Sequence, residues 1–154
     1  MKIEHIAIWT RDLEGMRNFY THYFDAVSGS DYYNHSKEFR SFFLSFGGES
    51  RLELMEMPAV SVNKNDYRKH TLGMAHLAFK VGTREKVDQL TDLLREDGFE
   101  IISPGRMTGD GYYESAIFDP EKNRIEIVAW GMKFQVWAHS DSEDSGLATN
   151  AQMH

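Results

Sequence analysis

The chain of 154 residues contains no cysteine and only three prolines. The absence of cysteine excludes disulfide bonds, thiolate zinc sites, iron–sulfur clusters and cysteine nucleophiles. Basic residues are also scarce, because 17 lysines and arginines face 24 aspartates and glutamates, for a formal net charge of -7. This balance argues against nucleic acid or an anionic membrane as the main partner, since either needs a basic surface. Because the chain has no thiol, any metal must be held by histidine, aspartate or glutamate.

Long apolar runs are missing as well. No stretch approaches the roughly 18 to 20 apolar residues that cross a membrane. The first residues, Met1–Ile6, have neither the sustained apolar region nor the small-residue cleavage site of a secretory signal, so we expect a cytoplasmic protein. Hydrophobic residues at 41% and aromatics at 13% argue against wholesale disorder, and the length suits one domain or two half-sized modules.

An internal repeat divides the chain. Residues 3–9 and 74–81 both predict a strand and share the pattern His-aliphatic-Ala-apolar, with His5 and His76 in register. Each strand is followed by a polar break and then by apolar residues at three- and four-residue steps, which predict a helix. The first helix is expected after Asp12, and the second between Thr83 and Gly98.

Strand-like runs follow each helix, and the last runs of the two halves match as Arg-aliphatic-Glu-aliphatic. These runs are 39–46, 51–55, 99–102, 112–118 and 124–128, with a flexible loop expected at 104–111. We therefore predict an α+β fold of two tandem βαβββ modules that form a curved mixed sheet with a metal-binding cleft. The predicted boundaries are 1–60 for the first module, 61–71 for a linker, 72–137 for the second module and 138–154 for a polar, mobile tail.

Two histidines and two glutamates occupy equivalent positions in the repeats. His5 and His76 lie in the first strands, and Glu53 and Glu126 lie in the last. Because side chains alternate between the faces of a strand, each of them points away from the flanking aliphatic residues. If the strands form one curved sheet, all of them can converge on its concave face. Such a set without sulfur suits a divalent metal such as Ni, Co, Zn, Mn or Fe.

Each of these residues alone has a simpler interpretation. A histidine in a strand is most often an ordinary hydrogen-bonded residue, and a glutamate between aliphatics is most often on a solvated face. The repetition favours the metal site, because packing gives no reason to keep both residue types facing outward twice. Among weaker candidates, Tyr112-Tyr113 could line a pocket or belong to the core, and Arg106 could bind an anion or be a solvated charge.

These motifs resemble the vicinal oxygen chelate superfamily, the glyoxalase/bleomycin resistance/dioxygenase group. The likeness covers about residues 1–130. It includes His-Ile-Ala-Ile at 5–8, Asp-Leu at 12–13, Phe-Tyr at 19–20, Arg-Leu-Glu-Leu at 51–54, His-Leu-Ala-Phe at 76–79, Phe-Asp-Pro at 118–120 and Asn-Arg-Ile-Glu at 123–126. The resemblance implies paired modules with one metal in each cleft, and clefts that are often completed by dimerisation, so a homodimer is expected.

Within that group, the His-Glu-His-Glu set looks most like bacterial glyoxalase I. This resemblance implies a lactoylglutathione lyase-like enzyme that isomerises a thiol–methylglyoxal hemithioacetal to a lactoyl thioester. Glu126 would remove the carbon-bound proton, Glu53 would be a ligand and second base, and the metal would hold the developing enediolate. The partner is thus a small-molecule substrate, expected to contact Trp9, Arg106 and Tyr113.

Two positions depart from bacterial glyoxalase I. That enzyme typically carries Arg four residues after the first ligand and Asn four residues after the second, both used for glutathione, whereas this chain has Trp9 and Met57. The sequence therefore leaves the identity of the thiol open.

Other functions also remain open. A thiol transferase, an epimerase or a dioxygenase of the superfamily is one alternative, although the transferases and dioxygenases usually hold the metal with three ligands. A non-catalytic binding or resistance protein is another, although such proteins generally lack the ligand set.

Overall fold

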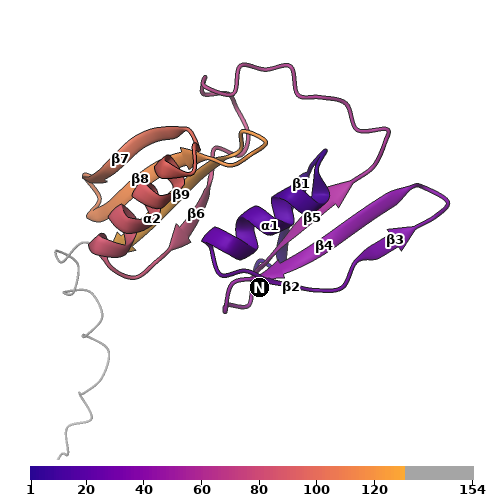
Figure 1. Cartoon of the computed structure of the whole chain (residues 1–154), viewed down its shortest axis with the longest axis horizontal. Helices are drawn as coiled ribbons and strands as arrows, with labels where there is room; N and C mark the ends of the chain where they lie inside the picture. Colours follow the sequence, from indigo (N-terminus) through magenta and orange to yellow (C-terminus); the bar gives the residue numbers. More distant parts are fainter. Residues whose placement is uncertain (131–154) are drawn as a thin grey trace, which may run out of the picture.

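The fold is described by a computed structural model that covers residues 1–130; the predicted tail lies outside the described residues. The first module consists of β1 (His5–Trp9), α1 (Leu13–Tyr23), β2 (Val27–Ser28), β3 (Tyr32–Asn34), β4 (Phe39–Ser45) and β5 (Arg51–Glu56). The second consists of β6 (Leu77–Lys80), α2 (Arg84–Glu96), β7 (Ile101–Met107), β8 (Tyr112–Phe118) and β9 (Arg124–Trp130). The two modules lie side by side (Figure 1).

Each module contains its own mixed sheet. The first has the strand order β1-β5-β4-β2, with β3 also paired to β4, and the second has the order β6-β9-β8-β7. In both sheets the first strand runs parallel to the last strand, and the other pairs are antiparallel. The α+β fold and the tandem repeat are thus confirmed, with the strands divided between two sheets. The short strands β2 and β3 were not predicted, and they pair with opposite ends of β4.

Both helices begin where the sequence predicts. Asp12 accepts a hydrogen bond from the backbone N–H of Gly15 at 2.9 Å, and Thr83 accepts one from Lys86 at 3.3 Å. After α2 the chain reverses at Gly98, whose φ of +87° is a conformation that favours glycine. Each helix buries its apolar face against its own sheet; the buried residues are Leu13, Met16, Phe19 and Tyr20 of α1 and Val87, Thr91 and Leu94 of α2.

The modules share a core of aromatic side chains. The ring of Phe79 in β6 lies 4.6 Å from that of Phe24 and 4.8 Å from that of Phe46. At the same contact, the fully buried Tyr20 donates a hydrogen bond to Asp119 at 3.0 Å. A module of this size buries little surface alone, so the shared core stabilises both halves.

The prediction of a loop at 104–111 is wrong for residues 104–107, which belong to a strand. Strand β7 continues to Met107 and pairs with β8, with register shifts between Ile101 and Ser103 and between Ser103 and Arg106. Pro104 and Gly105 lie within the second shift. Since β7 is at a sheet edge, a proline without an N–H and an irregular register are tolerated there.

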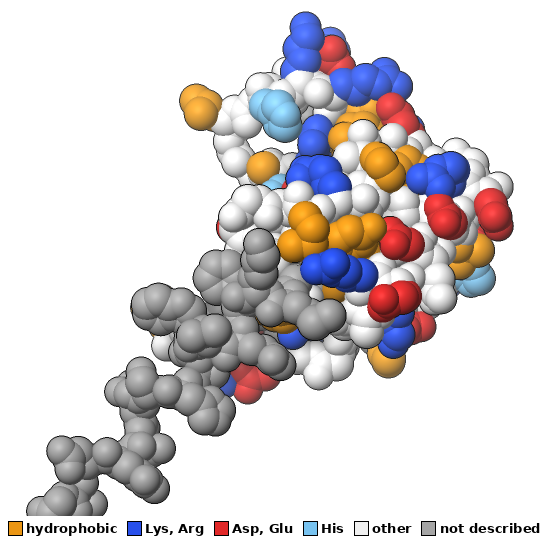
Figure 2. All heavy atoms as spheres, turned by 90° about the vertical axis from the view of Figure 1, so that its left-hand side faces the viewer, with side chains coloured by type: hydrophobic (Ala, Val, Ile, Leu, Met, Phe, Trp, Pro, Cys, Tyr) orange, Lys and Arg blue, Asp and Glu red, His pale blue; other side chains and the backbone are white. Residues whose placement is uncertain are grey.

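The surface agrees with the mixed charge of the sequence. Figure 2 shows acidic and basic side chains interspersed over the face of the second module, together with a group of hydrophobic side chains. Within residues 1–130, no helix is long and apolar enough to cross a membrane.

Candidate metal centre

The first module holds His5 and Glu53 on the face of its sheet that is not covered by α1. Glu53 is paired in register with Ala7, two residues beyond His5 on the parallel strand β1. The flanking Leu52 and Leu54 are buried under the helix, so alternation directs Glu53 to the open face. The distance from His5 Nε2 to Glu53 Oε2 is 3.8 Å. The imidazole and the carboxylate therefore point to the same place.

The second module repeats this arrangement with His76 and Glu126. Glu126 is paired in register with Ala78, again two residues beyond the histidine on a parallel strand. The flanking Ile125 and Ile127 are fully buried. His76 Nε2 lies 3.1 Å from Glu126 Oε2, and the two side chains are 38% and 18% exposed.

The two pairs are thus geometric copies, and each supplies one imidazole nitrogen and one carboxylate. They lie on different sheets, and residues 1–130 contain no group of three or more histidine, aspartate or glutamate side chains placed to bind a metal. A single chain therefore brings the predicted ligands together as two half-sites. The donor set still suits a divalent metal, because imidazole and carboxylate are its usual ligands when sulfur is absent.

Glu4 orients the histidine of the first half-site. Its carboxylate contacts His5 Nδ1 and is also paired with Arg51. These hydrogen bonds, first with His5 and then with Arg51, lower the pKa of Glu4. Because a carboxylate that holds one ring nitrogen fixes the direction of the other, this contact aims Nε2 towards Glu53. The edge of Phe43 packs against the same imidazole, with ring centroids 5.4 Å apart.

Glu114 accompanies the second half-site. It belongs to β8 and shares the face of Glu126, since Ala116, two residues along β8, is the register partner of Glu126. Burial raises the pKa of Glu114, and the nearby charge of Glu126 raises it further. Arg106 offsets part of this effect with an ion pair to Glu114 at 3.1 Å. The sequence pattern gave no signal for Glu114, because only the β8–β9 register brings it beside Glu126.

Residues 2–127 match the family model described as Glyoxalase/Bleomycin resistance protein/Dioxygenase superfamily. The chain belongs to this superfamily. Its relatives include the uncharacterized protein YwkD of Bacillus subtilis (strain 168), 30% identical over 127 residues, which cover 81% of this chain and 94% of the relative.

Solved structures of the superfamily have the same fold. The glyoxalase family protein of Enterococcus faecalis is 26% identical with a TM-score of 0.66, over 82% of this chain and 96% of that one. The trypanothione-dependent glyoxalase I of Leishmania major has a TM-score of 0.65 at 22% identity, over 84% of this chain and 86% of that one, a likeness of fold alone.

The residues predicted to contact substrate lie in three different settings. Trp9 shares the open face of His5 and is 43% exposed. Arg106 pairs with Glu114 beside the second half-site. Tyr113 lies on the opposite face, under α2, where its hydroxyl donates to Asp88 at 2.8 Å. Its neighbour Tyr112 is the tyrosine on the Glu126 face, and it stacks on Trp130 with ring centroids 4.5 Å apart.

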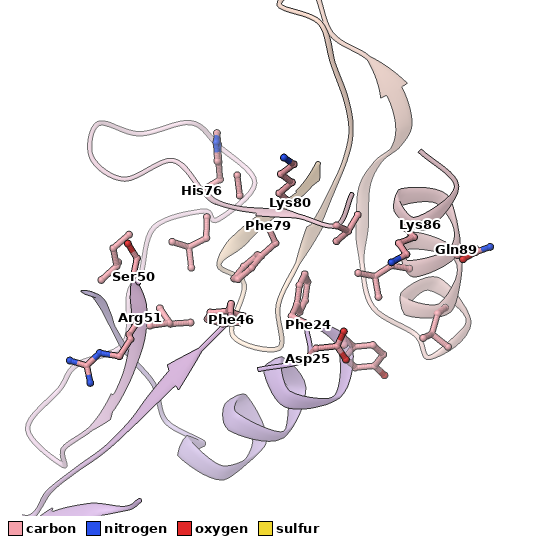
Figure 3. A pocket seen from close by; sticks show the side chains of 18 residues that line it. Phe24, Asp25, Phe46, Ser50, Arg51, His76, Phe79, Lys80, Lys86 and Gln89 are labelled. Carbon is pink, nitrogen blue, oxygen red and sulfur yellow. The ribbon is translucent and has the colours of Figure 1, made fainter. Parts of the chain in front are cut away.

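Two cavities adjoin these half-sites. One of about 870 Å³ lies between the modules; His76 and Lys80 of the second module and Arg51 of the first line it (Figure 3). The other, of about 1160 Å³, begins at Trp9 and extends under the segment that joins the modules. The first volume lies within the range of about 300–1,000 Å³ that is typical of small-molecule pockets, and the second lies slightly above it.

Proposed function

We propose that this member of the superfamily is a metal-dependent isomerase of the glyoxalase I type. Its substrate is the hemithioacetal of a 2-oxoaldehyde and a thiol, and its product is a 2-hydroxyacyl thioester. The observation that carries the proposal is the duplicated His–Glu pair, held at the same register on parallel strands of both modules. The likeness to a glyoxalase family protein at 26% identity supports the same class of chemistry.

The metal ligands in this proposal are His5, Glu53, His76 and Glu126. A divalent metal bound by them would act as a Lewis acid on the oxygen atoms of the substrate. The partial burial of both glutamates, at 14% and 18% exposure, favours this role, because carboxylates removed from water bind a cation more strongly than exposed ones.

Each complete site combines half-sites from two copies of the chain. Strand β1, which begins at His5, and strand β6, which directly follows His76, lie at the edges of their sheets, so their outer backbone groups are available to another strand. A two-fold dimer can set the His5–Glu53 half-site of one copy against the His76–Glu126 half-site of the other. Because a two-fold interface repeats every contact, such a dimer has two identical sites.

The carboxylates of the chain move the proton. Glu126 removes the proton from the substrate carbon that bears the hydroxyl and the sulfur, and returns it to the neighbouring carbonyl carbon. The hydroxyl of the first carbon becomes the thioester carbonyl, its proton passes to the second oxygen, and no oxidant or reductant is needed. Glu53 faces the substrate from the opposite half-site and is the second base.

Mixed dimers test both the site and its shared construction. His5→Ala and His76→Ala should each abolish metal binding and thioester formation in their own homodimers, because every site then lacks a ligand. A mixed dimer has one site with both substitutions and one intact site. Unfolding and refolding an equimolar mixture should therefore restore about a quarter of the wild-type metal content and activity.

The outcomes of this experiment separate the parts of the proposal. A site built within one chain would give no recovery, because each chain carries a defect. Full metal content in both homodimers would overturn the ligand assignment. Recovered metal without thioester formation from any thiol adduct would retain the metal site and reject the reaction.

A further inference from the structure

The larger cavity has a mixed lining that contains a cluster of apolar side chains near the first half-site. It opens at the ends of β1 and β5 and is covered by the connecting segment 57–74. Its large apolar residues come from three separate parts of the chain: Trp9, Met57, Val60, Val62 and Met74. Several of them stay in contact with solvent, since Trp9 is 43%, Val62 51% and Met74 64% exposed. Apolar side chains gathered around one hollow favour an apolar ligand.

Two of the basic residues that line this cavity are paired with carboxylates outside its lining. Arg40 pairs with Glu14 at 2.6 Å and with Asp31 at 2.8 Å. Lys122 pairs with Glu100 at 3.3 Å. Glu121 accepts hydrogen bonds from the backbone N–H groups that precede α1. The lining contains three basic residues, Arg11, Arg40 and Lys122, and three acidic ones, Glu38, Glu56 and Glu121, so it has no net positive charge to attract a ligand that carries two carboxylates.

Strand β1 connects the cavity to the half-site, because it carries both His5 and the cavity residue Trp9. Trp9 lies on the face of His5 and is paired in register with Met55, two residues beyond Glu53. Two residues on one face of a strand are about 7 Å apart. A substrate whose reacting carbons lie at Glu53 can therefore extend a side group of a few carbon–carbon bonds onto the indole of Trp9.

We propose that this cavity is a specificity subsite that binds an uncharged apolar or aromatic group of the substrate. The inference rests on the proposed function and narrows it, because the preferred hemithioacetal carries an aryl or bulky alkyl group and an uncharged thiol. Trp9 forms the wall against which this group packs, and Met74 closes the outer side.

Direct binding of an unreactive probe tests the subsite without turnover. The probe is 2-(benzylthio)ethanol, an uncharged thioether, titrated into the full-length wild-type protein by calorimetry. Trp9→Ala should raise the Kd about tenfold and Met74→Ala about threefold, since each removes apolar contact with the ring. Leu72→Ala is the matched control, because Leu72 is a solvent-exposed residue of the same segment that does not line the cavity. It should leave the Kd unchanged.

Turnover supplies a second readout. With adducts of 2-mercaptoethanol, Trp9→Ala should raise KM about tenfold for the phenylglyoxal adduct and much less for the methylglyoxal adduct, which has no ring to pack against the indole. Equal effects on both adducts, or no effect on either, would overturn the subsite while the proposed function stands. Probe binding that depends on Trp9 without thioester formation would retain the subsite and reject the proposed reaction.

The same variants distinguish other occupants of this surface. Sedimentation of wild type and Trp9→Ala should give the same oligomeric state. A wild type that does not bind the probe, together with a Trp9→Ala protein of smaller mass, would assign the surface to a subunit contact and overturn the proposal.

Discussion

The two modules of this protein hold the same pair of side chains in the same way and surround it differently. Ala7 lies opposite Glu53 in one module and Ala78 lies opposite Glu126 in the other, so the backbone frame is shared. Around the first pair lie Phe43 and Trp9, with Glu4 fixing the histidine. The duplicated frame thus preserves the ligands while the neighbouring positions diverge.

The second half-site has the more buried accompanying carboxylate, since Glu114 is 14% exposed and Glu4 is 59% exposed. It has Glu114 and Arg106 on the neighbouring strands, and the pKa of Glu114 is raised by burial and by Glu126. Under the proposed function the two halves would have different tasks, with proton transfer at Glu126 and recognition of an apolar group at Trp9. Substitutions at equivalent positions test that division.

The largest effect on kcat is expected from replacing each glutamate of the two pairs with glutamine. Glu126→Gln should lower kcat by about a thousandfold or more, because the amide cannot accept the carbon-bound proton. Glu53→Gln should lower kcat by about ten- to a hundredfold, because an amide is a weaker metal ligand than a carboxylate. Steady-state thioester formation, with metal content measured on the same samples, checks the comparison. Equal losses of kcat at equal metal content would mean that the two halves share the proton transfer.

Core truncations at matched positions should have the next largest effect. Leu54 and Ile127 are equivalent in the repeat and both fully buried. Leu54→Ala and Ile127→Ala should each lower the free energy of unfolding by about 2–5 kcal/mol. Because the modules share one core, both variants should unfold in a single transition by urea titration followed with circular dichroism and fluorescence. Two separate transitions would show that the modules unfold independently.

The hydrogen bonds between the modules differ in burial and should differ in strength. Tyr20→Phe should lower the free energy of unfolding by about 1–3 kcal/mol, because the buried Asp119 loses a donor. Tyr23 donates to the exposed Asp97 at 2.6 Å, so Tyr23→Phe should cost less than about 1 kcal/mol. Urea denaturation at neutral pH measures both. A larger loss for Tyr23→Phe would contradict the burial argument.

The smallest effect is a pH dependence at the same contact. Burial raises the pKa of Asp119, against the opposing hydrogen bonds from Asn123, Tyr20 and the Glu121 backbone. A carboxyl whose pKa is raised in the folded state stabilises that state while it is protonated, and this contribution is lost as pH rises through the folded pKa. Asp119→Asn should remove this loss of stability between acid and neutral pH, because the amide does not titrate. Urea denaturation of wild type and variant over that pH range measures the difference. If the two free energies of unfolding changed in parallel with pH, the prediction would be wrong.

Much of the fold followed from local patterns. The alternation around His5 and His76, the caps Asp12 and Thr83, and the helix end at Gly98 depend on neighbours in the chain, and each was predicted. The strands β2 and β3 were missed because they are short and depend on pairing with β4. The extent of β7 was missed because Pro104 and Gly105 usually mark a loop, whereas pairing with β8 overrides that preference.

The candidate site was predictable in composition but not in arrangement. The repeat identified His5, Glu53, His76 and Glu126. Packing does not explain why the same residue types face away from the core at equivalent positions of both modules. The sequence also places Trp9 on the face of His5. It could not place Tyr112 instead of Tyr113 beside Glu126, since that choice depends on which face of β8 the helix covers.

The sequence by itself determined the donor chemistry and the duplicated modules. With no cysteine, only nitrogen and oxygen ligands remain, and a repeated pattern of alternating side chains fixes which residues face away from each core. Only the tertiary structure decided that these side chains form two His–Glu pairs on separate sheets, and that Glu114 and a partly apolar cavity lie beside them. The physical reason is that strand pairing and module packing depend on contacts between residues far apart in the chain, which local periodicity does not specify.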